Sequence, residues 1–319
     1  MSPDTVIGVD AGGTKLLAGV VGEDLAVGHR VRRLWSGGDR AEVLDTMVEA
    51  VSEARSAVAG DVRAVGFGIP ALLDFEAGVA VSSVHLPFEG FAFRDAMAER
   101  LGLPVYLDND ANLAALAEQR LGAARGARNV VLLTLGTGIG SGIVLDGRLL
   151  RGATGAAAEI GHMTIDEHGP PCQGTCPGRG CLEVMASGTA IGREGTDAGR
   201  RHPHSALGRA VAQRGAVYGE EVAALAVAGD EAACSVMAAI GRSLGAGIAS
   251  IVNIFEPEVV VIGGGAAAAG DLLLDPAREV VAQRALRPSR DHARIVPAAL
   301  GEEAGMIGAA LFALAGSTP

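Results

Sequence analysis

The opening of the chain places two strand-length apolar runs on either side of a polar, glycine-rich turn. The runs cover residues 6–9 and 16–21, and the turn between them, which we call the first tip, reads Asp10-Ala-Gly-Gly-Thr-Lys15. Short apolar runs bounded by turn residues predict a β-hairpin. The pattern returns from residue 129, where two apolar runs flank a Gly/Thr-rich turn and an Asp-Gly hairpin turn follows. The two similar hairpins predict a duplicated, hairpin-led α/β architecture.

The segment between the two hairpins alternates strand and helix patterns. We expect a strand over residues 25–34, a capped helix that ends at Gly60, and a buried strand over residues 62–69. That strand ends at Gly68, where the following Ile-Pro turns the backbone and exposes amide groups. Residues 71–93 show no clear period and predict a long irregular loop, of a length that often carries function.

The rest of the chain is predicted to add a strand–helix corner, a helical region and a final strand. A strand after Pro104 leads through polar residues into a helix that Gly122 ends. Residues 187–253 have a mostly helical pattern, and a strand over residues 259–262 runs into three glycines. The predicted units are a first α/β domain over residues 1–122, a second over residues 123–302, and a last helix, residues 303–319, that packs back on the first.

The composition is that of a soluble globular protein and argues against some partners. The chain has 319 residues, of which 49% are apolar and 20% charged, which suits about two domains with ample core. Its net charge of −11 and isoelectric point near 5.1 argue against nucleic acid or an anionic membrane as partner. No stretch has the pattern of a signal peptide or a membrane span, so we expect a cytoplasmic protein that acts on a small molecule.

The first tip has the chemistry of a phosphate-binding turn. Its glycines let backbone amides approach an anion, Thr14 adds a hydroxyl donor, and Asp10 could hold a hydrated divalent cation. Lys15 is the only lysine among 26 basic residues, which argues for a specific contact. An ordinary tight turn with a solvated lysine is the alternative.

The second glycine-rich turn, residues 136–140, is the second tip. Two such tips at the starts of two similar halves suggest domains that clamp the phosphates of a nucleotide from both sides. A Rossmann dinucleotide fingerprint is rejected, because that motif must open a helix and here a strand follows the glycines.

A polar corner follows the strand after Pro104. It reads Asp108-Asn109-Asp110-Ala-Asn112 and opens a predicted helix. Helix capping, the structural explanation, needs only one such residue. Ligands collect at the carboxyl ends of strands in α/β sheets, so Asp110 is placed to accept a proton from a substrate hydroxyl. We therefore predict that Asp110 is a catalytic base.

A cluster of metal-binding residue types lies in the second half. Its members are His162, Cys172, Cys176 and Cys181. One imidazole and three thiols suit a closed tetrahedral zinc site, which would staple a loop poor in apolar residues. Zinc on one ring nitrogen of His162 would leave the other to contact a ligand. Glu159 and Glu183 flank the cluster; they are either solvated loop carboxylates or groups that bind sugar hydroxyls.

Together these motifs resemble those of the ROK family (repressor, open reading frame, kinase), in the actin/hexokinase ATPase superfamily. The resemblance covers essentially the whole chain and implies a two-domain, actin-like ATPase fold of the ribonuclease H-like type. It implies magnesium-dependent transfer of the ATP γ-phosphoryl group to a hexose, most often on carbon 6, by a glucokinase-like enzyme with structural zinc. It also implies a homodimer or homotetramer.

The resemblance assigns roles to individual residues. Asp110 is the general base. The sugar-binding positions are Asn109, Asp110, Glu159, His162 and Glu183, to which we add Gly68 at its exposed strand end. The nucleotide-binding positions are Asp10, Gly12, Gly13, Thr14, Lys15, Thr137, Gly138, Gly264 and Gly265. The zinc ligands are His162, Cys172, Cys176 and Cys181.

Three positions depart from the family pattern and keep alternatives open. Cys172 and Cys176 are separated by three residues where the family usually has one, and Ala158 stands where glycine is common. His85 stands where the glucokinases commonly have asparagine, in a loop that borders the sugar, so the identity of the hexose stays open. Kinases for N-acetylmannosamine, fructose or allose remain alternatives, as does polyphosphate in place of ATP.

Proteins of other classes are also possible. A sugar-responsive transcriptional repressor is disfavoured, because the first tip begins at Asp10 and leaves no room for a preceding helix-turn-helix. An actin-like filament protein would leave Glu159, His162 and Glu183 unexplained. A sugar-binding protein without catalysis would not need Asp110.

Overall fold

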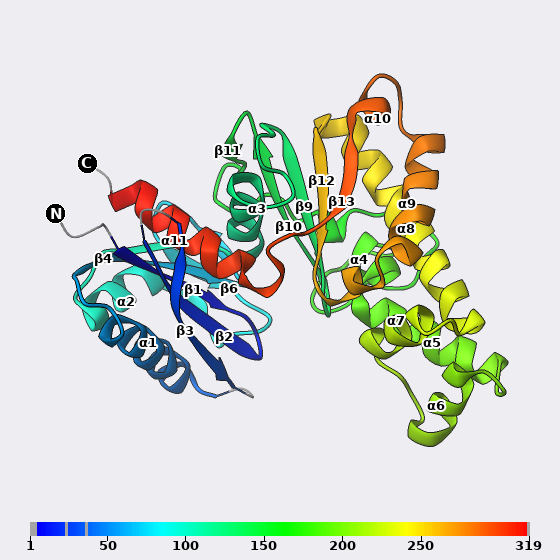
Figure 1. Ribbon diagram of the computed structural model, residues 1–319, viewed down its shortest axis with the longest axis horizontal. Coiled ribbons are helices and arrows are strands. Elements are labelled where there is room, and N and C mark those ends of the chain that lie inside the picture. The colour runs from blue at the N-terminus through cyan, green and yellow to red at the C-terminus, as the bar shows by residue number, and fades with distance from the viewer. Residues whose placement is uncertain (1–4, 23–24, 36–37, 318–319) are drawn as a thin grey trace.

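The structure is a computed structural model that describes residues 5–22, 25–35 and 38–317. Two five-stranded sheets form its frame, and their strand orders correspond (Figure 1). The first has the order β3-β2-β1-β4-β8, from Thr5–Ala11 (β1), Lys15–Val21 (β2), Val27–Leu34 (β3), Val62–Ile69 (β4) and Val105–Asn109 (β8). The second has the order β11-β10-β9-β12-β13, from Val130–Leu135 (β9), Ile139–Leu145 (β10), Arg148–Leu149 (β11), Val259–Gly263 (β12) and Arg294–Pro297 (β13). In both, an antiparallel hairpin continues into parallel strands, which confirms the predicted duplicated α/β fold.

Two helices cover one face of the first sheet. They are α1 (Arg40–Ser56) and α2 (Phe93–Leu101), and they share a core with Ile7 and Val9 of β1. Helix α1 begins at the predicted cap and ends at Ser56, a turn before Gly60. The sequence pattern does not predict α2, whose nine residues span little more than two turns.

The last helix, α11 (Ala304–Ser317), covers the opposite face of the first sheet. Two glycines make this contact close. A Cβ on Gly8 would lie 2.0 Å from the carbonyl oxygen of Met306, and one on Gly66 would lie 1.9 Å from that of Ala309. Strand positions without a side chain therefore let a helix backbone lie directly on the sheet. The division of the chain after residue 122 remains a prediction.

The prediction of a long irregular loop over residues 71–93 is wrong, because a third, three-stranded sheet lies there. It consists of β5 (Leu72–Asp74), β6 (Val79–Ser82) and β7 (Glu89–Phe91). Strands of three or four residues are too short for a period of two to be read from the sequence. Gly78, with a φ of 69°, ends the turn that joins β5 to β6.

Helices form most of the segment between β11 and β12, and the stretch predicted as mostly helical, residues 187–253, is helical over most of its length. They are α4 (Leu182–Ala186), α5 (Gly188–Arg201), α6 (Ala206–Arg214), α7 (Gly219–Val227) and α8 (Glu231–Phe255). Helix α9 (Asp271–Arg284) packs along α8, and the short α10 (Ser289–His292) follows. Three 3-10 helices lie at Ile160–His162, Gly265–Ala269 and Gly301–Glu303. By length and composition α8 could span a membrane, but 61% of its most apolar window is buried, as in a core helix.

Helix α3 (Asp110–Arg120) lies between the two five-stranded sheets and contacts both. Gly142 of β10 lets it approach, since a Cβ there would lie 2.5 Å from the carbonyl oxygen of Ala111. At its far end, the buried carboxylate of Glu118 accepts two backbone hydrogen bonds, 2.9 and 2.8 Å long, from the segment that leads into α11. Both ends of α3 are thereby held in place between the sheets.

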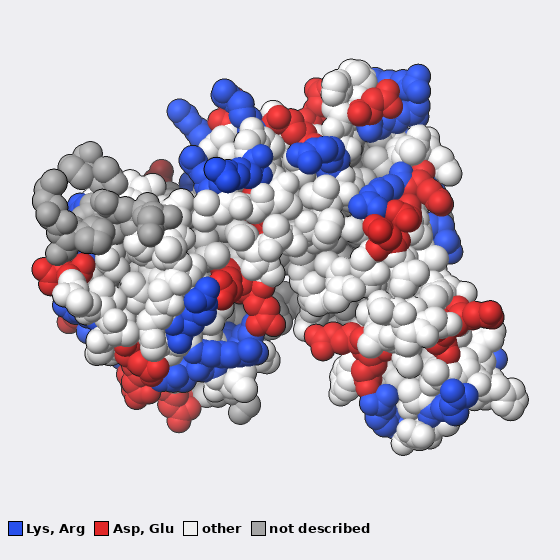
Figure 2. Space-filling view, viewed as in Figure 1, with Lys and Arg blue, Asp and Glu red and all other residues white. Residues whose placement is uncertain are grey.

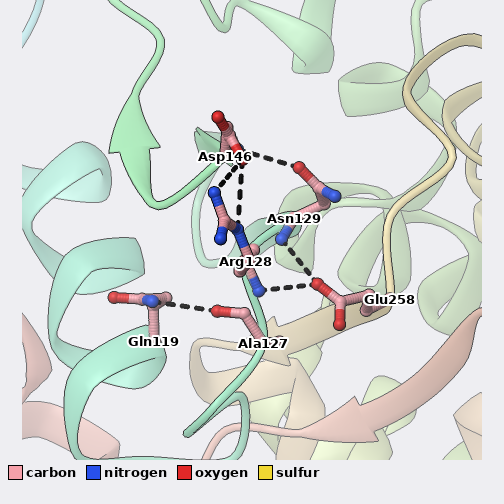
Figure 3. Close-up of polar contacts among 6 residues, drawn as sticks. All are labelled: Gln119, Ala127, Arg128, Asn129, Asp146 and Glu258. Atoms are coloured by element: carbon pink, nitrogen blue, oxygen red, sulfur yellow. Dashed lines mark hydrogen bonds and ion pairs between the residues drawn. The ribbon is translucent and has the colours of Figure 1, made fainter.

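A network of polar contacts connects the segments at the edge of the second sheet where β9 and β12 begin (Figure 3). Glu258 accepts from the backbone N–H groups of Arg128 and Asn129, at 2.6 and 2.9 Å. The side-chain oxygen of Asn129 accepts from the N–H of Asp146 at 2.9 Å, and Arg128 pairs with the Asp146 carboxylate. These groups are satisfied within the protein. A ligand is expected at the opposite edge, because the parallel strands end there.

Candidate active site

The carboxyl ends of three neighbouring strands bring together the predicted residues of the first half. In the sheet register, Asp10 of β1 lies opposite Gly68 of β4, and Gly68 lies opposite Asp108 of β8. A Cβ on Gly68 would lie 3.3 Å from the Cα of Asp110, so the glycine lets α3 begin directly beside the strand end. The carboxylates of Asp10 and Asp110 are close enough to repel each other.

Asn109 caps α3, which leaves the carboxylate of Asp110 available for another role. The side-chain oxygen of Asn109 accepts from the N–H groups of Ala111 and Asn112 at 2.9 and 3.2 Å. Asp110 accepts from Ala111 at 2.9 Å. Burial raises the pKa of Asp110 above its ordinary value. The hydrogen bond from Ala111 and the charge of His85 act in the opposite direction and lower the pKa. A desolvated carboxylate of this kind suits a general base.

Asp10 occupies a crowded, partly buried position in the first tip. A Cβ on Gly305, at the start of α11, would lie 2.6 Å from the Asp10 carboxyl carbon. Burial and then the charge of Asp110 raise the pKa of Asp10 from 3.8 to about 7, while the charge of Lys15 opposes this. Lys15 itself pairs with Glu302, Nζ to Oε2 at 3.0 Å. Its contact with phosphate remains a prediction.

We expect Asp10→Asn to stabilise the ligand-free protein at neutral pH. The folded pKa of about 7 lies above the ordinary value of 3.8, so the folded state retains a proton that the unfolded state releases between these values. Wild-type stability therefore falls as the pH rises through this window. The difference in the free energy of unfolding between Asp10→Asn and wild type should grow by at most about 1.4 kcal/mol per pH unit as the pH rises. It should become constant above pH 7.

Urea denaturation at pH 4.5, 6 and 7.5, without nucleotide or added magnesium, checks this prediction. Asp146→Asn, an exposed substitution of the same kind, is the control. Parallel stability curves for Asp10→Asn and wild type would contradict it.

Glu159, from the second half of the chain, lies close enough to Asp110 and to Glu183 for their charges to affect it. Partial burial raises the pKa of Glu159; His162 opposes this shift, and the carboxylates of Glu183 and Asp110 add to it. Glu183 Oε2 accepts from the backbone N–H of Ile139 at 2.8 Å and so lies against the second tip. Glu159 therefore connects the region of Asp110 with the region of the second tip, and each carboxylate can accept hydrogen bonds from hydroxyl groups.

The predicted zinc ligands lie together. The ligand atoms of His162, Cys172, Cys176 and Cys181 are all within 4.8 Å of one another. His162 directs Nδ1 to the cluster, 3.6 Å from the Cys172 sulfur, and Nε2 toward Glu159, at 3.9 Å. Burial raises the pKa of the Cys172 thiol to about 12, so only a cation would favour thiolates here. The donor set therefore fits zinc despite the longer Cys172–Cys176 spacing.

A cavity of about 670 Å³ opens beside the second tip. Two of the predicted nucleotide-binding residues, Thr137 and Gly265, line it. The start of α5 forms one wall, where Gly188 N–H donates to the Gly136 carbonyl and Thr189 Oγ1 to that of Thr137, each at 2.7 Å. The cavity is large enough for a small-molecule ligand of nucleotide size.

Two other predicted residues support this cavity without lining it. Gly138 lies beneath Glu183, since a Cβ there would be 2.3 Å from the Glu183 carboxylate. Gly264 has a φ of 83° and packs on the backbone of Leu135. Glycine is required at the second of these positions, because an L side chain would meet both strained backbone and a neighbouring strand.

Helical residues that the sequence pattern does not predict complete the cavity wall. They are Arg193, Asp197 and Arg200 of α5, with Tyr218 and Glu220 at the start of α7. Ser187 was the available signal: its hydroxyl caps α5 by accepting from Ala190 N–H at 3.3 Å, and Gly-Thr follows it. Such a helix start can bind an anion.

Two residues contact the glycines of the first tip. Trp35, the only tryptophan, donates from Nε1 to the Gly12 carbonyl at 3.0 Å. His85 packs against Gly13, since a Cβ on Gly13 would lie 2.8 Å from the His85 Cβ. The structure thus places His85 beside both the first tip and Asp110.

Comparison with known proteins identifies the class to which this fold and site belong. The sequence profile of the ROK family matches residues 6–315, and the chain belongs to that family. Both the predicted resemblance and the predicted fold class are confirmed.

Individual relatives sharpen this assignment. The chain is 38% identical to the glucokinase of Halalkalibacterium halodurans, over 97% of this chain and 94% of that protein. It is 33% identical to the ROK family glucokinase of Streptomyces griseus, whose crystal structure contains glucose and AMPPNP; the match covers 98% and 99% of the two chains, with a TM-score of 0.86. It is also 30% identical to a putative xylose repressor of Caldicellulosiruptor sp. (strain Rt8B.4), over 95% of this chain and 76% of the repressor.

Proposed function

We propose that the protein is an ATP-dependent glucokinase, which transfers the γ-phosphoryl group of ATP to the hydroxyl on carbon 6 of glucose. The observation that carries this proposal is the position of Asp110, whose carboxylate is close to Asp10 of the first tip and also to Glu159. Phosphoryl transfer to an alcohol requires a base between a phosphate site and a hydroxyl-binding site. The two glucokinase relatives support the same activity.

Asp110 would accept the proton of the attacking hydroxyl as the bond to phosphorus forms. Its raised pKa brings it nearer to neutral pH, where a base accepts a proton more effectively. Asn109, Glu159, Glu183 and the backbone at Gly68 would orient the other hydroxyl groups of the sugar. His162 Nε2 points toward Glu159 and would join them.

The nucleotide would occupy the cavity beside the second tip, with its phosphates between the two tips. Amides of Gly12, Gly13 and Gly138 and the hydroxyls of Thr14 and Thr137 are the proposed phosphate donors, and Gly264 and Gly265 the proposed contacts of the adenosine. Asp10 would hold the hydrated Mg²⁺, since a cation offsets the repulsion that raises its pKa. Bound Mg²⁺ supplies neutralisation of phosphate charge.

Zinc is proposed as a structural ion. His162, Cys172, Cys176 and Cys181 would complete its coordination and leave no open position for catalysis. Through His162, the ion would fix the loop that carries Glu159.

Kinases of other hexoses remain the nearest alternatives. His85 stands against the first tip and close to Asp110, where the family's glucokinases commonly have asparagine. Fructose, allose or N-acetylmannosamine would use the same base and phosphate tips. Polyphosphate is less favoured as donor, because the chain has a net charge of −11 and a long polyanion favours a basic groove. Figure 2 shows acidic and basic side chains interspersed on the face that it draws.

A sugar-responsive repressor is the alternative from another class, since one relative is a putative xylose repressor. A repressor needs to bind sugar but needs no base, so the partly buried Asp110, whose pKa is raised by desolvation, favours the kinase. A cytoplasmic location and a homodimer or homotetramer complete the proposal.

An assay coupled to ADP release tests the proposed activity. Purified protein with Mg-ATP would be offered glucose, fructose, allose and N-acetylmannosamine, and polyphosphate would replace ATP in a parallel series. We expect the highest kcat/KM for glucose with ATP. A higher kcat/KM for another hexose would show that this hexose, and not glucose, is the preferred substrate. The absence of turnover on every sugar would overturn the kinase assignment.

A further inference from the structure

Arg151 links the two halves of the molecule at the polar corner that contains Asp110. It follows β11 of the second sheet, and its Nε donates to Oδ2 of Asp108, at the end of β8 in the first sheet, at 2.8 Å. Asp108 is only 1% exposed. Removing one partner of a buried ion pair leaves an uncompensated charge, so this pair is a persistent connection between the sheets.

Aromatic rings hold the guanidinium of Arg151 in place. Its Cζ lies 4.1 Å from the ring centre of Phe75, which follows β5, and 5.1 Å from that of Phe312 in α11. The N–H of Phe75 donates to the Thr154 carbonyl at 3.2 Å, so the segment after β11 contacts the first half at a second point. A planar guanidinium can stack on rings and bind a carboxylate at once, which an ammonium group cannot reproduce.

Asp108 also binds the first turn of α3, which carries Asp110. Its Oδ1 accepts from the backbone N–H of Asn109 at 2.8 Å and from the side-chain amide of Asn112 at 3.0 Å. Asn109 caps α3, and Asp110 is the first residue of that helix. Both oxygens of Asp108 are therefore engaged, one by the second half and the other by the first turn of α3.

We propose that Arg151 is a positioning residue for phosphoryl transfer, which aligns the Asp110 turn with the second sheet through Asp108. This inference rests on the proposed kinase activity. The base belongs to α3 and the second tip joins β9 to β10, so the reacting groups meet only when these elements keep one relative orientation. An error of about 1 Å in such an arrangement costs roughly 100-fold in rate.

Steady-state kinetics of Arg151→Gln test this role. We expect kcat with glucose to fall roughly 10- to 100-fold. KM for glucose and for ATP should stay within about 3-fold, because Arg151 acts through Asp108 and touches neither substrate. Arg151→Lys, which keeps the charge but loses the stacked plane, should give an intermediate kcat.

A double variant separates positioning from general damage to the fold. Asp108→Asn combined with Arg151→Gln removes both charges, so no buried carboxylate is left unpaired, and kcat should fall no further than in the single variant. Arg128→Gln is the matched control, since it breaks an exposed pair with Asp146 at the opposite edge of the second sheet. Its kcat should equal that of wild type.

Binding can be followed apart from turnover through Trp35, which contacts Gly12 of the first tip. Tryptophan fluorescence during titration with AMPPNP should give the same Kd for Arg151→Gln and wild type. A lower melting temperature with unchanged kcat, or raised KM and Kd with unchanged kcat, would overturn the positioning role. If wild type turns over no hexose, the proposed function itself fails; if wild type is active and the Arg151 variants match Arg128→Gln, this inference alone fails.

Discussion

We expect Asp110→Asn to lower kcat for glucose phosphorylation about 10²- to 10⁴-fold while glucose binding largely survives. The amide keeps the shape of the side chain but cannot accept the hydroxyl proton. Helix α3 should remain intact, because Asn109 and not Asp110 caps it. The coupled ADP assay gives kcat, and calorimetric titration with glucose gives the Kd, which should change by no more than about 3-fold.

Asp146→Asn is the matched control for this substitution. Asp146 is exposed, pairs with Arg128 and has a φ of 53°, a conformation that asparagine adopts readily. Its kcat should equal that of wild type. Full activity in Asp110→Asn would show that Asp110 is not the general base. A loss of glucose binding in parallel with the loss of kcat would show that Asp110 acts in binding instead.

We expect Cys181→Ser to lose at least about 100-fold in zinc affinity and to unfold at a lower temperature. Cys181 is buried and belongs to the cluster whose ligand atoms lie within 4.8 Å of one another. Without the ion, His162 and the loop that carries Glu159 lose their fixed position, so KM for glucose should rise more than KM for ATP. Elemental analysis of the purified protein measures the zinc, and a thermal melt measures the stability.

Cys234→Ser provides the comparison. Cys234 is the one cysteine outside the cluster, in α8, where its sulfur contacts the Ala226 carbonyl at 3.3 Å. This variant should retain one zinc per chain. Equal zinc content in both variants, or a wild-type protein purified without zinc, would contradict the structural-metal assignment.

Local patterns were sufficient to predict the two hairpin-led halves of the fold and the segments that carry the first half of the candidate site. Each hairpin is encoded by two adjacent apolar runs and the glycines between them, so the duplication is visible in the sequence before any contact is known. The polar corner that contains Asp110 is equally local, because a strand end and a helix start are adjacent in the chain. The cysteine cluster lies within a single loop for the same reason.

The nucleotide cavity could not be predicted because its walls come from separate helices. Arg193 in α5 and Tyr218 before α7 meet only through tertiary packing. In sequence each belongs to an ordinary amphipathic segment, where a polar residue is expected on the solvent side. Only the start of α5, with Ser187 ahead of a Gly-Thr pair, gave a local signal.

The connection made by Arg151 is long-range in a similar way. Its carboxylate partner, Asp108, lies 43 residues earlier, and its aromatic neighbours are Phe75, which follows β5, and Phe312 in α11. An arginine after a two-residue strand carries no pattern of its own. The short strands β5 to β7 escaped prediction because three or four residues are too few to show a period of two, and their pairing with one another is a tertiary contact.

The most direct measurement is identification of the product. Purified protein would be incubated with Mg-ATP and glucose, and the phosphorylated sugar and its position would be read from phosphorus–proton correlation NMR. The proposed function predicts ADP and glucose 6-phosphate in equal amounts, and at least about 100-fold less of both from Asp110→Asn in the same time. ATP that remains intact, or that is hydrolysed to inorganic phosphate without any phosphorylated sugar, would contradict it.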